Sequence, residues 1–180
     1  MVEKAAARTS GARKPPRGLT SIGAISVSEV DVPRFVLSDP PFLEIYLAEP
    51  LMRITMVKEG LSAGYLDKLA KSLNITKDRL LPTLGIAQST VSRKVREGKP
   101  LSTEDSERAL GMARLIGQVE AMVQQSGDPT GFDAAKWLAR WLEEPLPALG
   151  GRPPSSLMDT GEGQAMVSNL LARMQSGAYA

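Results

Sequence analysis

The most restrictive feature of the sequence is the segment Leu146–Thr160, which is rich in proline and glycine and separates two stretches of helical periodicity. Apolar residues recur at helical spacing within Phe132–Glu144 before it and within Met166–Met174 after it. Pro145 and Pro147 must end the first helix, because proline donates no backbone hydrogen bond and disfavours helical backbone in the preceding residue. The sequence therefore predicts two helices joined by a long, irregular and stiff connection.

This segment also carries apolar side chains among its turn-forming residues, at Leu146, Leu149, Leu157 and Met158. Apolar groups on a stiff frame must be covered, either by the protein's own core or by a partner. An ordinary helix–helix connection is the simpler interpretation, although the segment is long for one. Asp159 or Thr160 is expected to cap the next helix by accepting a hydrogen bond from one of its first N–H groups.

Residues 62–97 have the pattern of a helix-turn-helix. A first helix is predicted because apolar residues follow the spacing i, i+3, i+4, i+7, at Leu66, Leu69, Ala70 and Leu73. A second helix is expected over Lys77–Leu84, with Thr76 as its cap and Pro82 as a defect that shortens or bends it. A tight link around Gly85 then leads to a polar, basic third helix, Gln88–Glu97. This order of elements is typical of DNA-binding modules.

The third helix is the predicted DNA contact. Val91 and Val95 are expected to face the core, which leaves outside the polar and basic side chains that suit base edges and phosphates. The candidate DNA-binding residues are Gln88, Ser89, Thr90, Ser92, Arg93, Lys94 and Arg96. Ala87 provides no capping oxygen for the first N–H groups of this helix. A solvated basic face without DNA contact is the alternative.

A long helix is predicted to follow. Ser102 should cap it, acidic residues in its first turn suit the helix dipole, and it should end near Gly127-Asp128-Pro129. Its apolar stripe runs from Ala109 to Val123. The stripe is broader than one small module needs, so we expect it to contribute to a homodimer interface as well as to the core. Trp137 and Trp141, at i, i+4 in the next helix, are expected in the core, with an interface anchor as the alternative.

The first 60 residues are less informative. Residues 1–18 are rich in Ala, Arg, Lys and Pro and predict a mobile arm, and loose apolar alternation in 19–37 is compatible with one or two short strands. Ser38-Asp39-Pro40 is a helix-start signal. Helices are then expected over Phe42–Glu49 and Leu51–Glu59, the second one beginning at Pro50 and ending at Gly60.

Composition excludes several kinds of chemistry. The chain has 180 residues and contains neither cysteine nor histidine, which removes disulfides, thiol nucleophiles, the commonest general base and the commonest metal ligand. Glu143 and Glu144 are adjacent and point to different helix faces, so they cannot act as a catalytic carboxylate pair. We therefore predict no catalytic residue, no metal site and no cofactor.

The absence of a long apolar run and of a signal-peptide pattern predicts a cytoplasmic protein with no membrane partner.

Charge is unevenly distributed along a chain whose formal net charge is only +2. Residues 50–100 contain ten basic and four acidic residues, whereas residues 101–180 contain six basic and ten acidic ones. A basic middle and an acidic C-terminal part indicate two different partners. A phosphate backbone is the expected partner of the basic helical segment.

Two strings resemble a known family. PALGGRPPSSLMDTGEG, which begins at Pro147, and the final LLARMQSGAYA resemble the C-terminal domain of the Xre/MbcA/ParS antitoxins. LGIAQSTVSRKVREGK, which begins at Leu84, is similar to the recognition-helix region of Xre-type repressors. The resemblance covers about Leu61 to Ala180. It implies that the C-terminal domain binds a RES-domain toxin, an enzyme that acts on NAD, and that the helix-turn-helix either contacts DNA or serves as a scaffold.

The resemblance and the residue chemistry together suggest which side chains contact the toxin. Paired glycines let backbone approach a partner, and an arginine offers a forked donor to a carboxylate. The predicted toxin-binding residues are Leu149, Gly150, Gly151, Arg152, Leu157, Asp159, Arg173, Tyr179 and Ala180. Tyr179 and the terminal carboxylate of Ala180 have shapes suited to a nucleotide pocket, so we hypothesise that the C-terminal segment lies at the toxin's NAD site.

The sequence as a whole predicts an all-α protein: an arm over 1–37, a helix-turn-helix domain over 38–100 and a toxin-binding domain over 101–180. We predict an antitoxin that covers the active site of a RES-domain toxin, NAD-degrading or ADP-ribosylating, and binds operator DNA. It is expected to form a homodimer within a toxin–antitoxin heterotetramer or larger assembly. The alternative is a stand-alone transcription regulator whose C-terminal domain serves dimerisation.

Overall fold

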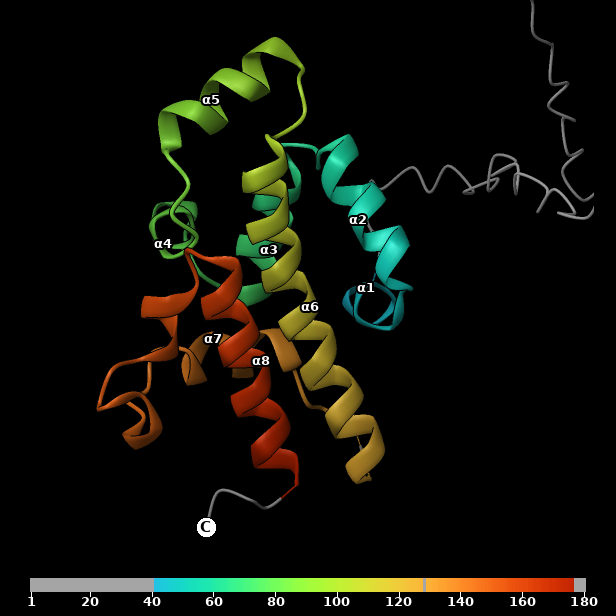
Figure 1. Cartoon of the computed structure of the whole chain (residues 1–180), viewed down its shortest axis with the longest axis vertical. Helices are drawn as coiled ribbons and strands as arrows, with labels where there is room; N and C mark the ends of the chain where they lie inside the picture. Colours follow the sequence, from blue (N-terminus) through green and yellow to red (C-terminus); the bar gives the residue numbers. More distant parts are fainter. Residues whose placement is uncertain (1–40, 128, 177–180) are drawn as a thin grey trace, which may run out of the picture. The chain divides into compact units, whose positions relative to one another are not determined.

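The computed structural model describes residues 41–127 and 129–176, and its regular elements within these ranges are all helices (Figure 1). They are α1 (Phe42–Leu47), α2 (Pro50–Glu59), α3 (Tyr65–Leu73), α4 (Lys77–Thr83), α5 (Gln88–Glu97), α6 (Thr103–Ser126), α7 (Ala134–Trp141), the 3-10 turns η1 (Pro147–Leu149) and η2 (Pro154–Leu157), and α8 (Gly161–Gln175). The all-α prediction is confirmed. The predicted arm (1–18), the possible strands (19–37) and the helix-start signal at Ser38 lie outside the described residues, and the N-cap of α1 is Pro41.

Helix α6 is the element on which four of the other helices pack. Ser102 caps it as predicted, since its Oγ accepts a hydrogen bond from the Asp105 N–H at 3.1 Å, and Gly127 ends it at φ 138°. Helices α1, α2, α7 and α8 all contact α6. Gly117 allows α1 to approach closely, because a Cβ at this position would lie 2.0 Å from the carbonyl oxygen of Phe42.

The apolar stripe of α6 is covered by the chain itself. Ala109, Met112, Ala113, Ile116 and Val119 are all buried, and only the last position, Val123, is half-buried. The prediction that this stripe also forms a subunit interface is therefore wrong. The stripe is broad because four helices of the same chain pack around it, and a homodimer must use another surface.

Helices α3, α4 and α5 form the predicted helix-turn-helix. The four apolar residues of α3 are buried, and Asn74 ends the helix in left-handed backbone at φ 55°. Thr76 is the N-cap of α4 but makes no side-chain hydrogen bond, and Pro82 lies in the final turn of α4, which ends at Thr83. Gly85, at φ 62°, then turns the chain into α5.

Val95 does not face the core as predicted: its side chain is 56% exposed. Val91, one turn earlier on the same face of α5, is buried. Helix α5 thus contacts the rest of the protein near its N-terminal end and extends past the core, as Figure 1 shows. Helical spacing identified the correct face of α5 but not the point at which the supporting helices end.

Helices α7 and α8 carry the C-terminal part of the core. Trp141 is buried and stacks on the half-buried Trp137 with ring centroids 6.0 Å apart, so the core interpretation of this pair is correct. On α8, Val167, Leu170 and Leu171 are buried, but Met166 is 46% exposed, because α6 covers only one side of the helix. None of the described helices is both long and apolar enough to cross a lipid bilayer.

Candidate functional site

The predicted DNA-binding residues all lie on α5. Gln88, Ser89, Ser92, Arg93 and Arg96 are exposed, and Thr90 and Lys94 are half-buried. Within the described residues, none of the three cations Arg93, Lys94 and Arg96 forms an ion pair with a carboxylate. Their charges are therefore not neutralised by these parts of the chain. The Gln88 side chain differs, since its Nε2 donates to Asp78 Oδ1 of α4 at 3.2 Å.

The N-terminal end of α5 has no side-chain cap. Ala87 occupies the N-cap position in extended backbone and offers no side-chain acceptor. The first N–H groups of α5 are therefore without the acceptor that Ser, Thr, Asp or Asn would supply. The uncapped N–H groups and the cations of α5 are both groups that can donate hydrogen bonds to phosphate oxygens.

The segment Leu146–Thr160 forms a compact loop with a hydrogen-bonded base. Leu146 and Arg152 form an isolated antiparallel bridge, in which the Leu146 N–H donates to the Arg152 carbonyl at 3.2 Å. Gly150 and Gly151, at φ 64° and 79°, turn the chain at the tip, where an added Cβ would meet no atom within 4 Å. The tip is therefore open, and glycine is required there by backbone conformation rather than by crowding.

The apolar residues of this loop attach it to the protein's own core. Met158 is fully buried, and Leu146, Leu149 and Leu157 are half-buried against the core. The Ser155 N–H also donates to the Leu142 carbonyl at 2.8 Å, which ties η2 to the end of α7. Of the two alternatives, core and partner, the core covers most of this apolar surface, and the half-buried leucines keep some surface exposed beside the tip.

The predicted toxin-binding residues do not form one cluster. Gly150, Gly151 and Arg152 lie together at the exposed loop tip. Asp159 precedes α8 and Arg173 lies in its last turn, so the rise of a helix separates them by about 20 Å. Both are exposed. Tyr179 and Ala180 lie outside the described residues.

Sequence reasoning missed Arg108 of α6, which connects the helix-turn-helix to the rest of the core. Its Nη1 donates to the Leu84 and Gly85 carbonyls at 3.2 and 2.8 Å, and its Nη2 pairs with Asp105 at 3.2 Å. The turn before α5 is therefore held by a charged donor with little solvent exposure. Gly85 also approaches the loop, since a Cβ there would lie 3.0 Å from the Cβ of Asp159.

Gln164 of α8 was missed as well. Its Nε2 donates to the Arg108 carbonyl at 3.0 Å and to the Met158 carbonyl at 2.9 Å, so it joins α6, α8 and the end of the loop. Close packing reinforces this junction, because a Cβ at Gly163 would lie 1.9 Å from the Leu157 carbonyl oxygen. The signals for this junction in the sequence are a glutamine between apolar positions of α8 and two glycines at the start of that helix.

Replacing Gln164 by leucine is expected to destabilise the protein by about 1–3 kcal/mol. The substitution removes the amide donor and leaves the Arg108 and Met158 carbonyls without it in a buried site. Urea unfolding measures the effect. Gln175→Leu is the matched control, because its amide is exposed on the same helix. Equal stability of the two variants would contradict the role given to Gln164.

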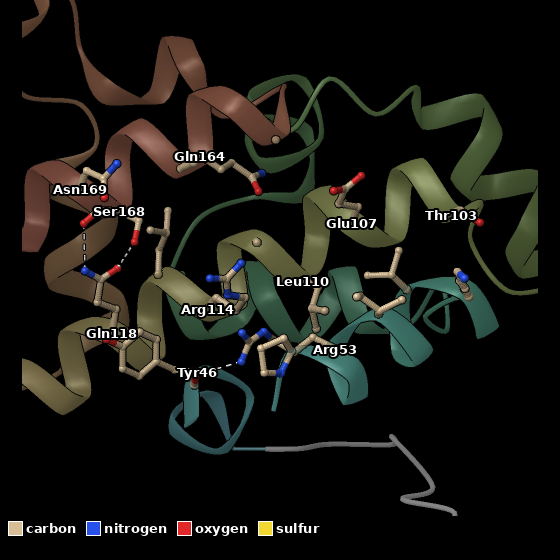
Figure 2. Close-up of a pocket in the computed structure, with 18 residues that line it drawn as sticks. Tyr46, Arg53, Thr103, Glu107, Leu110, Arg114, Gln118, Gln164, Ser168 and Asn169 are labelled. Carbon is tan, nitrogen blue, oxygen red and sulfur yellow. Dashed lines mark hydrogen bonds between the residues drawn. The ribbon is translucent and has the colours of Figure 1, made fainter. Parts of the chain in front are cut away.

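A cleft of about 650 Å³ lies along α6 between α2 and α8. Figure 2 shows Arg53 of α2 and Arg114 of α6 on one side and Gln164, Ser168 and Asn169 of α8 on the other. Arg53 donates to the carbonyls of Tyr46 and Ala48, and burial and then the neighbouring charge of Arg114 lower its pKa. Two guanidinium groups thus lie close together in one cleft that contains none of the predicted DNA or toxin contacts.

Comparison with known families assigns both halves of the described chain. Residues 52–114 match the antitoxin Xre-like helix-turn-helix domain. Residues 130–177 match the antitoxin Xre/MbcA/ParS C-terminal toxin-binding domain. The first match contains α3–α5 with the Arg108 contact, and the second contains α7, the loop and α8.

Individual relatives agree with these matches. The chain is 48% identical over 143 residues to the Prs ADP-ribosylating antitoxin of Sphingobium sp., a match that covers 78% of this chain and 90% of that protein. It is 29% identical over 126 residues to Antitoxin Xre of Yersinia enterocolitica, covering 70% of this chain and 80% of the relative. A third relative, Antitoxin Xre of Pseudomonas putida, is 25% identical over 126 residues, and this match covers 68% of this chain and 70% of the relative. The chain therefore belongs to the Xre/MbcA/ParS family of antitoxins, with a helix-turn-helix domain followed by a toxin-binding domain.

Proposed function

We propose that this antitoxin binds and neutralises a RES-domain toxin that uses NAD, and that it acts by covering the toxin rather than by an enzymatic reaction of its own. The observation that carries the proposal is the position of the open loop tip, Gly150–Arg152, within the toxin-binding domain. The loop is held by its bridge and by Met158, so its tip meets a partner without first being ordered.

The name of one relative favours one toxin chemistry. The Sphingobium protein, at 48% identity, is a Prs ADP-ribosylating antitoxin. ADP-ribosylation transfers the ADP-ribose part of NAD to an acceptor, so we propose ADP-ribosyl transfer, rather than NAD degradation alone, for the toxin paired with this chain. The acidic residue excess of 101–180 suits a toxin whose NAD-binding mouth is cationic.

Toxin capture by the loop tip is tested with Arg152→Glu. If Arg152 donates to a toxin carboxylate, reversal of its charge is expected to weaken the complex at least tenfold, since a charged hydrogen bond contributes about 1.5–3 kcal/mol. Binding of the purified toxin and its NAD turnover are measured together. Arg96→Glu on α5 is the matched control and is expected to leave both unchanged. An Arg152→Glu variant that binds and silences the toxin like the wild type would rule out the loop tip as the anchor.

We also propose that α5 binds operator DNA and that two copies of the chain read a symmetric operator. The exposed cations of α5, not paired within the described residues, support this.

A stand-alone regulator would bind its promoter equally without any toxin partner. Co-purification with the product of a neighbouring gene separates the two functions, because only an antitoxin retains a tightly bound toxin.

A further inference from the structure

Helix α5 is joined to the core at few points. Val91 is the one residue of α5 that is buried, and Val95, one turn further on, is 56% exposed. At the start of the helix, Gln88 Nε2 donates to Asp78 Oδ1 of α4, but this contact is exposed to solvent. A helix of ten residues is about 15 Å long, so one buried side chain in its first half cannot fix the direction of the whole helix.

The two ends of α5 differ in how firmly the chain holds them. At the C-terminal end, Gly98 turns the chain at φ 61°, an added Cβ there would meet no atom within 4 Å, and the next buried residue is Leu101. At the N-terminal end, Leu84 and Ile86 are both buried, on either side of Gly85. The turn over residues 84–87 is therefore the segment that can set the direction of α5.

The Arg108 side chain of α6 holds this turn by two of its carbonyl groups. Its Nη1 donates to the Leu84 carbonyl at 3.2 Å and to the Gly85 carbonyl at 2.8 Å. Glycine is needed at position 85 for two reasons: its φ is 62°, and a Cβ on it would lie 2.9 Å from Arg108 Nη1. The turn is thus shaped to admit the guanidinium group.

The guanidinium group is itself fixed on α6. Its Nη2 lies 3.2 Å from Asp105 Oδ1 and 3.1 Å from Glu104 Oε1, and its Nε donates to the Glu104 carbonyl at 3.3 Å. The Arg108 side chain is only 13% exposed. Because a guanidinium is a planar fork that donates in several fixed directions at once, it can transfer the position of α6 to the turn, which a lysine ammonium cannot do equally well.

We propose that Arg108 is the positioning residue of α5: it sets the direction in which α5 leaves the core, and thereby the part of operator affinity that depends on base sequence. The proposal rests on the operator binding proposed above for α5. Contacts to base edges need side chains at defined places in the groove, whereas phosphate oxygens recur along the backbone and carry no sequence information. Arg108 therefore acts on base recognition through α5.

Arg108→Lys tests this role, because it keeps the positive charge and removes the fork. Affinity of the full-length protein for its promoter should fall about tenfold, the order of effect of losing one well-placed base contact. Affinity for a shuffled duplex of the same length and composition should stay unchanged, as should the slope of log affinity against log salt. Fluorescence anisotropy measures all three. Arg114→Lys, an exposed arginine of the same helix in the α2–α6–α8 cleft, is the matched control and should bind both duplexes like the wild type.

Hydrogen–deuterium exchange of the free protein provides a second measurement that needs no DNA. Amide groups of residues 85–97 should exchange faster in Arg108→Lys, whereas those of α7 should not change, because a local opening affects only the segment that has lost its support.

Several results would overturn the role given to Arg108. They are an unchanged promoter affinity, an unchanged exchange in α5, and an equal loss of affinity for both duplexes accompanied by faster exchange throughout the chain, which would indicate a general loss of stability. A wild type that does not distinguish its promoter from the shuffled duplex would instead refute the proposed operator binding, and the positioning role with it.

Discussion

Replacing Arg93, Lys94 and Arg96 together by alanine is expected to reduce affinity for the antitoxin's own promoter by about a hundredfold or more, at about 1–3 kcal/mol for each good base contact. The three side chains lie on α5, where Arg93 and Arg96 are exposed and Lys94 is half-buried. Lost phosphate contacts should also lower the slope of log affinity against log salt by about one for each contact. Fluorescence anisotropy with a promoter fragment at several salt concentrations measures both quantities.

A matched control separates recognition by α5 from the effect of net charge. The triple variant Lys71→Ala, Arg140→Ala, Arg173→Ala removes the same charge from exposed positions on other helices. It should retain most of the affinity for the promoter. If the α5 variant binds like the wild type, the helix-turn-helix is a scaffold; if both triple variants lose affinity equally, binding is a long-range charge effect.

Gly163→Ala is expected to destabilise the protein by about 3 kcal/mol, the upper part of the range for overpacking a tight contact. The added Cβ would lie 1.9 Å from the Leu157 carbonyl oxygen and 2.9 Å from Thr160 Oγ1. The first is a backbone atom of η2, and the second is the cap that accepts from the Gly163 N–H at 3.0 Å. Alanine gains about 1 kcal/mol in helix propensity, which this clash outweighs. Urea unfolding measures the loss.

Gly161→Ala provides the control two residues earlier in the same turn. A Cβ there would meet only Glu107 Oε1, at an ordinary contact distance of 3.6 Å. This variant should be as stable as the wild type or slightly more stable. If Gly163→Ala behaves in the same way, the start of α8 shifts easily, and the loop is less firmly held than its contacts indicate.

Local signals in the sequence were sufficient for the helix ends. Gly60, Ser102 and Gly127 each ended or capped a helix where expected, because a cap depends on the few residues around it. Helical periodicity predicted burial wrongly where the burial of a side chain depended on the length of a neighbouring helix. Val95 has the spacing of a core residue but lies past the end of the helices that support α5.

The candidate sites divide in the same way. The α5 residues were predicted as a group because one helix places them together. Arg108 and Gln164 could not be found, since their acceptors are 23 and 56 residues away in the chain, at Gly85 and Arg108. The burial of the α6 stripe was also inaccessible to sequence, because a broad apolar stripe does not reveal whether its cover comes from the same chain or from another.

The close approach of Gly85 to Asp159 has a consequence for how the two partners affect each other. Gly85, in the turn before α5, lies against Asp159 at the end of the loop, and Arg108 donates to the Gly85 carbonyl. A shift of one of these segments is therefore expected to disturb the other. Two domains on a flexible tether would bind their partners independently. Here any change in operator affinity that the toxin produces must be matched by an equal change in toxin affinity produced by the operator. Under the proposed function, operator DNA bound at α5 and toxin bound at the loop tip would each change the affinity of the chain for the other.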